Sequence, residues 1–331
     1  MTKAKVIVIC GQTSTGKSDF AVALALQLLS GQAKKIEGPA RNALSIAYAG
    51  GEIVSADSRQ VYIGLDIGSG KITPKEMQGI PHHMLDVAKP NKVFTVAQYK
   101  KLADKKIKEI IKRGNIPIIC GGTGFYIDAI INDITLPQVP PNKKLRTELE
   151  NKTANELFNI LKKLDSVRAQ NIDSKNPVRL IRAIEIATAL GSVPNANPTC
   201  GKYDVLKIGL NLPDEVLKER IYKRIIKRIK CGMIDEVMAL HDKGLSWARM
   251  GDLGLEYRYI SQYLQEKIDN ESRPSQMLRR AKMIDKLNKK TWQYAKRQKT
   301  WFKRDRNTIW INPLNKIEIK NTFTKVKEFL G

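Results

Sequence analysis

The sequence of 331 residues has few cysteines, no apolar run long enough to cross a membrane, and no internal repeat. Its cysteines are far apart and include no Cys-x-x-Cys pair, so nothing predicts a disulfide framework or a cysteine-based metal site. They are Cys10, Cys120, Cys200 and Cys231. A membrane-spanning helix needs roughly 20 apolar residues, and the first residues do not resemble a secretory signal. These absences predict a soluble cytoplasmic protein with no membrane partner.

Acidic residues are scarce compared with basic ones. The chain has 33 Asp and Glu against 58 Lys and Arg, which gives a formal net charge of +25 and favours a polyanionic partner. Basic residues are densest over residues 279–306, and aromatic side chains are interleaved with them: Trp292, Tyr294, Trp301 and Phe302. We favour RNA contact, with bases stacked on these rings. The alternative is an amphipathic helix whose aromatic side chains face the core.

A complete phosphate-binding loop stands near the start of the chain. It fits the pattern G-x-x-x-x-G-K-[ST] and consists of Gly11, Gln12, Thr13, Ser14, Thr15, Gly16, Lys17 and Ser18. An apolar run over residues 6–10 precedes the loop and a helical pattern over residues 20–29 follows it. We expect its amides to bind phosphate oxygens, Lys17 to reach the outer phosphate, and the Ser18 hydroxyl to bind Mg²⁺. The alternative is a glycine-rich turn without a ligand.

The first part of the chain, residues 1–135, alternates between strands and helices. Two further strands are predicted over residues 52–56 and 116–120, with an amphipathic helix over residues 96–111. Such alternation predicts an α/β fold with a parallel sheet core like that of P-loop NTPases. Ligands of such sheets bind at the carboxyl ends of the strands, so we expect the three loops there to converge.

The remaining chain is predicted to be mainly helical. Prolines near residue 137 begin a helical insertion over residues 136–200, and residues 201–331 return to the core before a basic helical C-terminal region. The expected helices cover residues 144–150, 154–164, 177–190, 214–230, 234–243, 253–267 and 274–302, and a strand covers 205–210. Residues 31–51 have no clear periodicity and are predicted to form a long surface loop.

Asp57 is the leading candidate for a general base, because a carboxylate at the end of a buried strand can accept a proton beside bound phosphate. It is alternatively a Mg²⁺ ligand through water, or an aspartate that only caps a turn. Thr123 lies in the glycine-rich segment 121–126, where its hydroxyl can donate to a diphosphate oxygen. That segment is alternatively a bare glycine turn.

Two pairs of arginines are spaced to share a helix face. Arg220 and Arg224 are four residues apart and can neutralise charge on a departing diphosphate; the alternative is a solvated or RNA-facing surface. Arg179 and Arg182 are three apart in the helical insertion and can contact phosphate. The adjacent histidines at 82–83 have no ligand at metal spacing nearby, so we expect no metal there.

Seven motifs occur in an order that resembles the tRNA dimethylallyltransferases, also called tRNA isopentenyltransferases. They lie at residues 11–18, 56–62, 66–68, 81–83, 121–126, 182–185 and 295–301. The resemblance extends over residues 5–312, and no zinc finger follows residue 305, which is typical of the bacterial type. It implies transfer of a dimethylallyl group from dimethylallyl diphosphate to N6 of adenosine 37 in tRNA. Diphosphate leaves, and ATP is not used although the loop is of the ATP-binding type.

The resemblance also implies roles for individual residues. Lys17 and Mg²⁺ on Ser18 stabilise the leaving diphosphate, Asp57 deprotonates the adenine amine, and Thr123 with Arg220 or Arg224 contacts the diphosphate. The target base leaves the anticodon stem-loop and enters the site. The residues implied to contact tRNA are Asp57, Ser58, Arg59, Gln60, Val178, Arg179, Leu180, Ile181, Arg182, Lys296, Arg297 and Gln298, with a segment near 254–258. We expect a monomer.

Two other enzymes remain as alternatives. A P-loop small-molecule kinase would need an adenine site and has no use for the basic region near residues 295–301 or for the helical insertion. An isopentenyltransferase acting on free adenine nucleotides shares the chemistry, but the insertion and the net charge of +25 favour tRNA. An RNA-binding protein with a dead site is disfavoured because Lys17, Ser18, Asp57 and Thr123 are intact.

Overall fold

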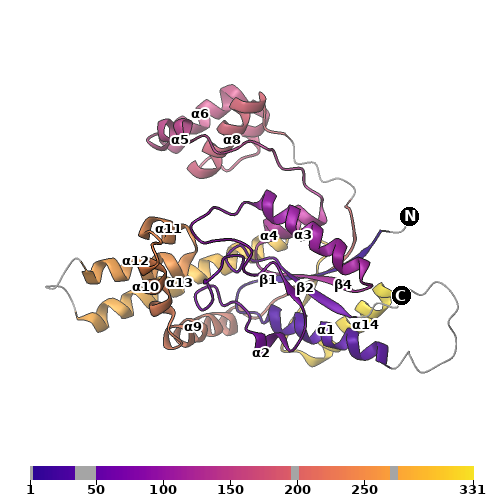
Figure 1. Cartoon of the computed structure of the whole chain (residues 1–331). Helices are drawn as coiled ribbons and strands as arrows, with labels where there is room; N and C mark the ends of the chain where they lie inside the picture. The colour runs from indigo at the N-terminus through magenta and orange to yellow at the C-terminus, as the bar shows by residue number, and fades with distance from the viewer. Residues whose placement is uncertain (1–2, 34–49, 195–200, 269–274) are drawn as a thin grey trace. The chain divides into compact units, whose positions relative to one another are not determined.

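A six-stranded parallel sheet organises the protein, with strand order β3-β2-β4-β1-β5-β6 (Figure 1). The computed structural model describes residues 3–33, 50–194, 201–268 and 275–331. The strands are β1 (Lys5–Gly11), β2 (Gly51–Ser55), β3 (His82–His83), β4 (Ile116–Cys120), β5 (Asp204–Leu210) and β6 (Ile309–Ile311). The predicted α/β fold of the P-loop kind is confirmed. The edge strands β3 and β6 were missed, because two or three residues are too few to show an alternating pattern.

The side chains of β1 alternate between the two faces of the sheet, as a strand requires. Val6 and Val8 belong to one buried cluster, and Ile7 and Ile9 to another. All four are fully buried, which explains why this strand is a continuous apolar run. The sheet therefore has a hydrophobic layer on each face.

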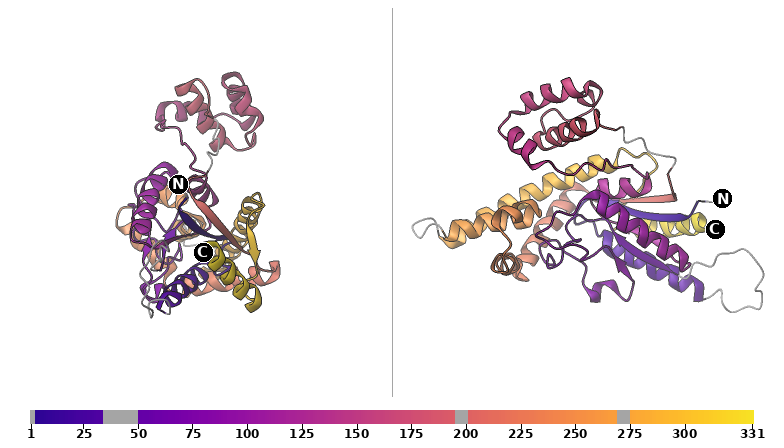
Figure 2. Two further views of the ribbon diagram at one scale, coloured as in Figure 1. Left: turned by 90° about the vertical axis from the view of Figure 1, so that its right-hand side faces the viewer. Right: turned by 45° about the horizontal axis from the view of Figure 1, so that its top comes forward.

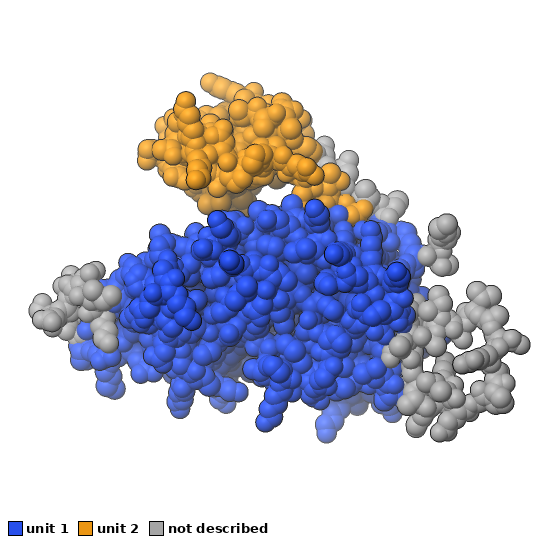
Figure 3. Space-filling model, in the orientation of Figure 1, with its two compact units in different colours: residues 1–132, 201–331 blue, residues 133–200 orange. Residues whose placement is uncertain are grey.

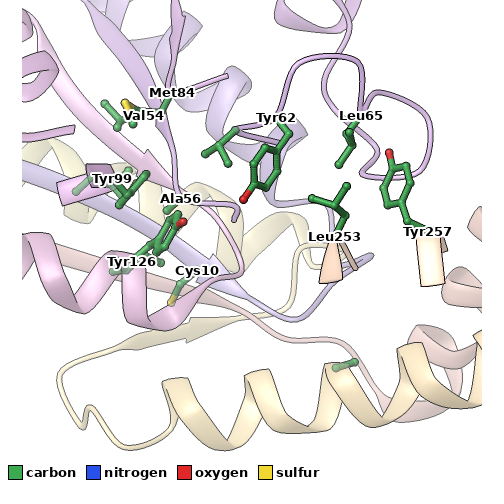
Figure 4. Close-up of a cluster of buried hydrophobic side chains, with 14 of the residues drawn as sticks. Cys10, Val54, Ala56, Tyr62, Leu65, Met84, Tyr99, Tyr126, Leu253 and Tyr257 are labelled. Atoms are coloured by element: carbon green, nitrogen blue, oxygen red, sulfur yellow. The ribbon is translucent and has the colours of Figure 1, made fainter. Parts of the chain in front are cut away.

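Helices cover both layers (Figures 1 and 2). One face carries α1 (Lys17–Ala33) and α14 (Lys316–Leu330), whose side chains join Ile7 and Ile9. The other face carries α3 (Val96–Lys112) and α4 (Gly124–Ile131). Figure 4 shows the buried side chains of this second layer, including Tyr99 of α3 and Tyr126 of α4. Their rings stack with centroids 3.9 Å apart.

The predicted loop at residues 31–51 is corrected at both ends. Helix α1 continues to Ala33, and β2 begins at Gly51. Both ends are glycine-containing segments whose lack of apolar periodicity suggested a loop. Residues 34–49 lie outside the described residues.

Five further helices of six or more residues lie in the described part of the larger compact unit, which comprises Met1–Asn132 and Gly201–Gly331 (Figure 3). They are α9 (Asp214–Lys230), α10 (Met233–Asp242), α11 (Trp247–Asp252), α12 (Leu255–Ile268) and α13 (Gln276–Phe302). Helix α11 was not predicted, and neither was the single turn α2 (Pro74–Met77). Both are too short for a helical repeat and depend on N-caps, Ser246 and Thr73, whose side chains accept backbone hydrogen bonds.

The second compact unit, Asp133–Cys200, has a hydrophobic core of its own. Its helices are α5 (Lys143–Glu150), α6 (Ala154–Leu164), α7 (Ser166–Gln170) and α8 (Pro177–Leu190). Each begins at a side chain that caps the first turn: Asn142, Thr153, Asp165 and Asn176. The Glu185 carboxylate is buried and accepts hydrogen bonds from Arg146, at 2.7 Å, and from Arg182. This unit therefore holds its helices by both capping and a buried ion pair.

Within the described parts of the chain, no helix combines the length and the apolar character that crossing a membrane would require.

Candidate active site

Three loops converge at the carboxyl ends of β1, β2 and β4. The backbone of Gly121 donates to Ile9 of β1, and Thr123 donates to Ala56, which follows β2. Two glycines of the phosphate loop adopt positive φ angles, +136° at Gly11 and +88° at Gly16. A Cβ on Gly11 would also overlap the Leu210 carbonyl of β5. Gly11 is therefore needed for this close approach of backbones, and Gly16 for its positive φ angle.

Lys17 lies at the start of α1 with its ammonium turned back onto the phosphate loop. Its Nζ donates to the Gln12 carbonyl at 2.5 Å, and the Thr15 hydroxyl donates to the same oxygen at 2.8 Å. Burial, with a smaller contribution from the nearby Arg224, lowers the pKa of Lys17 from its ordinary 10.5 to about 8, and Asp57 opposes the shift. Burial without a counterion disfavours the charged form of Lys17, so an anion bound beside it would stabilise the ammonium.

Asp57 forms a turn at the end of β2 and keeps one carboxylate oxygen free. Its Oδ1 accepts from the amides of Arg59 at 2.8 Å and Gln60 at 3.4 Å. Its Oδ2 receives no hydrogen bond from any described residue. One oxygen of the Asp57 carboxylate therefore caps the turn, as one of the alternatives predicted. The other oxygen remains available to accept a proton or to bind a metal-bound water.

Thr123 links the glycine-rich loop to the Asp57 turn. Its Oγ1 accepts from the Ser58 amide at 3.0 Å and donates to the Ser58 hydroxyl at 3.3 Å. A Cβ on Gly121 would overlap the Ala56 carbonyl, so these two segments touch backbone to backbone. The Thr123 hydroxyl, which is predicted to bind diphosphate, therefore also stabilises the turn that holds Asp57, the candidate base.

Arginines of α9 provide the positive charge beside the phosphate loop. Arg224 donates from Nη1 to the Thr13 hydroxyl at 3.1 Å. Burial, with the neighbouring Arg228 as the next cause, lowers the pKa of Arg224 to about 10. Arg220 makes no hydrogen bond or ion pair with the described residues. Of the two arginines predicted from the sequence, the structure brings Arg224 to the loop.

Arg228 was missed by sequence reasoning, although it lies one further helical turn along α9. Its Nη1 donates to the Gly68 carbonyl at 3.1 Å and to Glu256 at 3.2 Å, while its Nη2 is buried without a partner. A Cβ on Gly70 would meet the Nη2 atoms of both Arg224 and Arg228, so the two guanidiniums converge there. One carboxylate cannot balance both, and the site is left cationic.

Glu236 of α10 shapes the loop that receives these arginines, and it too was missed. Its carboxylate accepts from the backbone amides of Asp66 at 3.0 Å, Ile67 at 2.7 Å and Gly68 at 2.9 Å. The Tyr257 hydroxyl donates to it at 2.8 Å. The motif at residues 66–68 is therefore a set of amides arranged around a carboxylate. Only tertiary structure pairs a glutamate so distant in sequence with this loop.

The predicted tRNA-contact residues of the larger unit differ in exposure. Lys296 and Arg297 are exposed on α13, whereas Gln298 is 5% exposed and uses its amide inside the protein. Arg59 donates to the Asp252 carbonyl at 2.8 Å and Gln60 to the Gly70 carbonyl at 3.1 Å. Burial of Gln298 is the clearest difference from the sequence-based expectation.

The predicted tRNA-contact residues of the smaller unit also differ in exposure. Val178 is 77% exposed and Arg179 is exposed, so both present surface at the start of α8. Leu180 is fully buried in the core of the unit, and Ile181 packs beside it. Arg182 donates to Glu185 at 3.1 Å and to the Val139 carbonyl at 2.8 Å. The side chain of Leu180 consequently supports the unit's core, whereas those of Val178 and Arg179 are at the surface.

The aromatic residues of α13 divide between the core and the surface. Phe302 is fully buried, and the Trp301 indole donates to Asp128 at 2.8 Å, so these two follow the amphipathic-helix alternative. Trp292 and Tyr294 are half-buried, and each has a cation over its ring, Lys296 for Trp292 at 5.8 Å from the centroid. The mixed arrangement leaves only part of the aromatic set accessible to bases.

The donors at the loop fit Mg²⁺ held mainly by substrate. Among the described residues no group of three or more His, Cys, Asp or Glu side chains could hold a metal. Mg²⁺ bound with a phosphorylated substrate needs only one or two protein ligands. Ser18 is exposed at the first turn of α1, and Asp57 keeps its free Oδ2. These two oxygens are suited to that role.

The sheet, the phosphate loop and the convergent arginines define a P-loop α/β protein with a cationic site for a phosphorylated ligand. Residues 60–305 match the family model described as IPP transferase, and this is well over half of the chain. The chain therefore belongs to the IPP transferase family, as its motif order predicted.

Individual relatives are similar over nearly their whole length. A tRNA dimethylallyltransferase 2 of Treponema denticola is 39% identical over 311 residues, which cover 92% of this chain and 94% of the relative. A tRNA dimethylallyltransferase of Pediococcus pentosaceus is 36% identical over 335 residues, 99% and 97% of the two chains. The crystal structure of the full-length tRNA isopentenylpyrophosphate transferase from Bacillus halodurans is 32% identical with a TM-score of 0.68, covering 99% of this chain and 97% of that one.

Proposed function

We propose that this protein transfers a dimethylallyl group from dimethylallyl diphosphate to N6 of adenosine 37 in the anticodon stem-loop of tRNA. The observation that carries the proposal is one site in which Lys17 and Arg224 flank the phosphate loop, while the Asp57 carboxylate, with one oxygen free, is close enough to oppose the lowering of the pKa of each. Such a site can hold a leaving diphosphate and accept a proton. Family membership supplies the substrates.

The diphosphate is assigned to the amides of residues 11–18, to Lys17 and to Arg224, with Arg228 beside them. Glu256 pairs with Arg228 at 3.2 Å, and Asp57 acts on both Lys17 and Arg224. Two carboxylates do not balance the positive charge of Lys17, Arg224 and Arg228, so an entering diphosphate compensates the remainder. Ser18, with the diphosphate oxygens, would hold Mg²⁺, which supplies further charge neutralisation when bound. Thr123 is assigned to the diphosphate and to support of the Asp57 turn.

Asp57 is assigned to the acceptor amine. As N6 forms its bond to C1 of the dimethylallyl group, the C1–O bond breaks, the diphosphate leaves with the electron pair, and Oδ2 takes the amine proton. Because Oδ1 is fixed by two amides, the carboxylate is held in one orientation for this transfer. The flipped base is the part of the tRNA that must reach it.

One experiment tests the whole proposal. The protein is incubated with dimethylallyl diphosphate, Mg²⁺ and an anticodon stem-loop, and the RNA is examined by mass spectrometry for one added dimethylallyl group. EDTA should stop the reaction. Substituting AMP for the RNA tests the free-nucleotide alternative, and turnover of radiolabelled ATP without prenyl transfer would instead identify a kinase.

Donor affinity should depend on pH through Lys17. Below pH 8 its amine is protonated in the free protein; above about 8, its lowered pKa, binding must also take up a proton. The affinity for dimethylallyl diphosphate should thus be level near pH 7 and fall by up to about tenfold per pH unit above 8. Equilibrium dissociation constants measured between about pH 7 and 9 test this, and Lys17→Arg, which keeps its charge, should flatten the decline. A level profile in the unaltered protein would argue against Lys17 as a diphosphate ligand.

Affinity for the stem-loop should fall steeply with salt, because RNA phosphates release counterions when lysines and arginines bind them. Lys296 and Arg297 are exposed beside the half-buried aromatics, so replacing either by Ala should reduce the slope of log K against log salt by about 1. Lys320→Ala, an exposed lysine of α14, serves as the control. A stem-loop affinity that does not change with salt concentration would contradict the presence of a basic RNA-binding surface.

A further inference from the structure

The buried face of α13 touches both loops assigned to the diphosphate. Gln298 accepts from the Thr13 amide of the phosphate loop at 2.8 Å through Oε1. Its Nε2 donates to the Gly122 carbonyl of the glycine-rich loop at 2.9 Å. One side-chain amide therefore bridges segments that follow β1 and β4, using its acceptor on one and its donor on the other.

The surroundings leave this amide little freedom. Gln298 is 5% exposed, and a Cβ on Gly122 would overlap its Nε2, so the glycine is what permits the contact. Gln12 adds a second link one helical turn earlier, donating from Nε2 to the Ala295 carbonyl at 3.2 Å. Both links join the phosphate loop to the same helix.

We propose that Gln298 is a positioning residue that holds the phosphate loop and the glycine-rich loop in register for diphosphate, and that it does not itself contact tRNA. The proposal rests on the proposed function of this site. It departs from the sequence-based expectation, which grouped Gln298 with the exposed Lys296 and Arg297 as a tRNA contact.

The consequences of the bridge reach the charged groups. Thr13, whose amide Gln298 fixes, presents the hydroxyl to which Arg224 donates. On the other side, Gly122 immediately precedes Thr123, which supports the Asp57 turn through Ser58. Without the two hydrogen bonds of Gln298, the phosphate loop and the glycine-rich loop would become ordered only when the donor binds. The cost of ordering them would then reduce the affinity for the donor. The bridge thus aligns the anion site with the candidate base.

The test compares Gln298→Met with the unaltered full-length enzyme. Methionine is similar in size and keeps the packing, but it forms neither hydrogen bond. Gln293→Met is the matched control, because Gln293 is an exposed glutamine on the same helix. We measure the dissociation constants of dimethylallyl diphosphate with Mg²⁺ and of the anticodon stem-loop alone, the KM and kcat for prenyl transfer, and the thermal midpoint.

We expect Gln298→Met to weaken diphosphate binding about tenfold, equivalent to about 1.4 kcal/mol, and to raise the donor KM similarly. Stem-loop affinity should stay within about twofold, and Gln293→Met should change neither. Gly122→Ala, which displaces the amide from the other side, should reproduce the loss and serves if the first variant fails to fold.

Other outcomes overturn the inference. Weaker stem-loop binding with normal diphosphate binding would make Gln298 a tRNA contact. Unchanged affinities for both ligands, or equal losses in both with a lower thermal midpoint, would remove any positioning role. If the unaltered enzyme bound no dimethylallyl diphosphate, the proposed function would fail first, and the positioning role with it.

Discussion

Asp57→Asn should lower kcat for prenyl transfer by about 10²- to 10⁴-fold, the range expected for loss of a general base. Asparagine keeps an oxygen that can accept from the Arg59 and Gln60 amides, so the turn at the end of β2 should survive. Only the ability of the second oxygen to take a proton is lost. Single-turnover transfer to the anticodon stem-loop at saturating donor measures the effect on the chemical step.

Binding measurements separate this chemical role from a structural one. The stem-loop dissociation constant should remain within about threefold, because the carboxylate acts on the proton rather than on affinity. Asp242→Asn, an exposed aspartate at the end of α10, should leave both rate and binding unchanged. Near-normal turnover by Asp57→Asn would instead leave the residue as a turn former alone.

The parts of the site that sequence predicted are those whose chemistry is local. The phosphate loop is recognisable because glycines with positive φ and a following helix must occur together in the chain. Asp57 and Thr123 could be placed because each stands within three residues of the end of a buried strand, and the carboxyl ends of parallel strands share one edge. The fold class followed from the same alternation of strands and helices.

The parts that sequence missed depend on contacts between distant segments. Arg228 is one basic residue among several on α9, and its hydrogen bonds to the Gly68 carbonyl and to Glu256, both distant in sequence, distinguish it from its neighbours. Glu236 reveals its role only when the amides of residues 66–68 surround it. Gln298 directly follows two exposed basic residues, Lys296 and Arg297, and no helical pattern over so short a stretch separates a buried amide from a surface one.

The same comparison shows which sequence-based groupings were too coarse. A stretch of adjacent residues on a helix must divide between faces, because successive side chains are about 100° apart. Leu180 therefore belongs to the core of its unit while Val178 and Arg179 are exposed. Tests of tRNA contact are best directed at Arg179, Lys296 and Arg297, whose side chains reach the surface.

Lys17→Ala should lower kcat/KM for the donor by about 10²- to 10³-fold, with losses in both binding and kcat. Negative charge on the diphosphate grows as the C1–O bond breaks, so an ammonium at the outer phosphate stabilises the transition state more than the bound donor. The structure holds this ammonium ready at the phosphate loop, 2.5 Å from the Gln12 carbonyl. Stopped-flow binding and single-turnover rates with varied dimethylallyl diphosphate resolve the two losses.

The control for Lys17→Ala must remove a lysine without removing charge from the site. Lys320→Ala does so, because Lys320 is exposed on α14 and no described residue pairs with it. It should leave kcat/KM unchanged, and stem-loop binding should be normal in both variants. Since Lys17 is half-buried and its pKa is lowered by that burial, Lys17→Ala should not destabilise the empty protein. Full activity in Lys17→Ala would show that the loop binds no diphosphate, and the assignment of the donor site would fall with it.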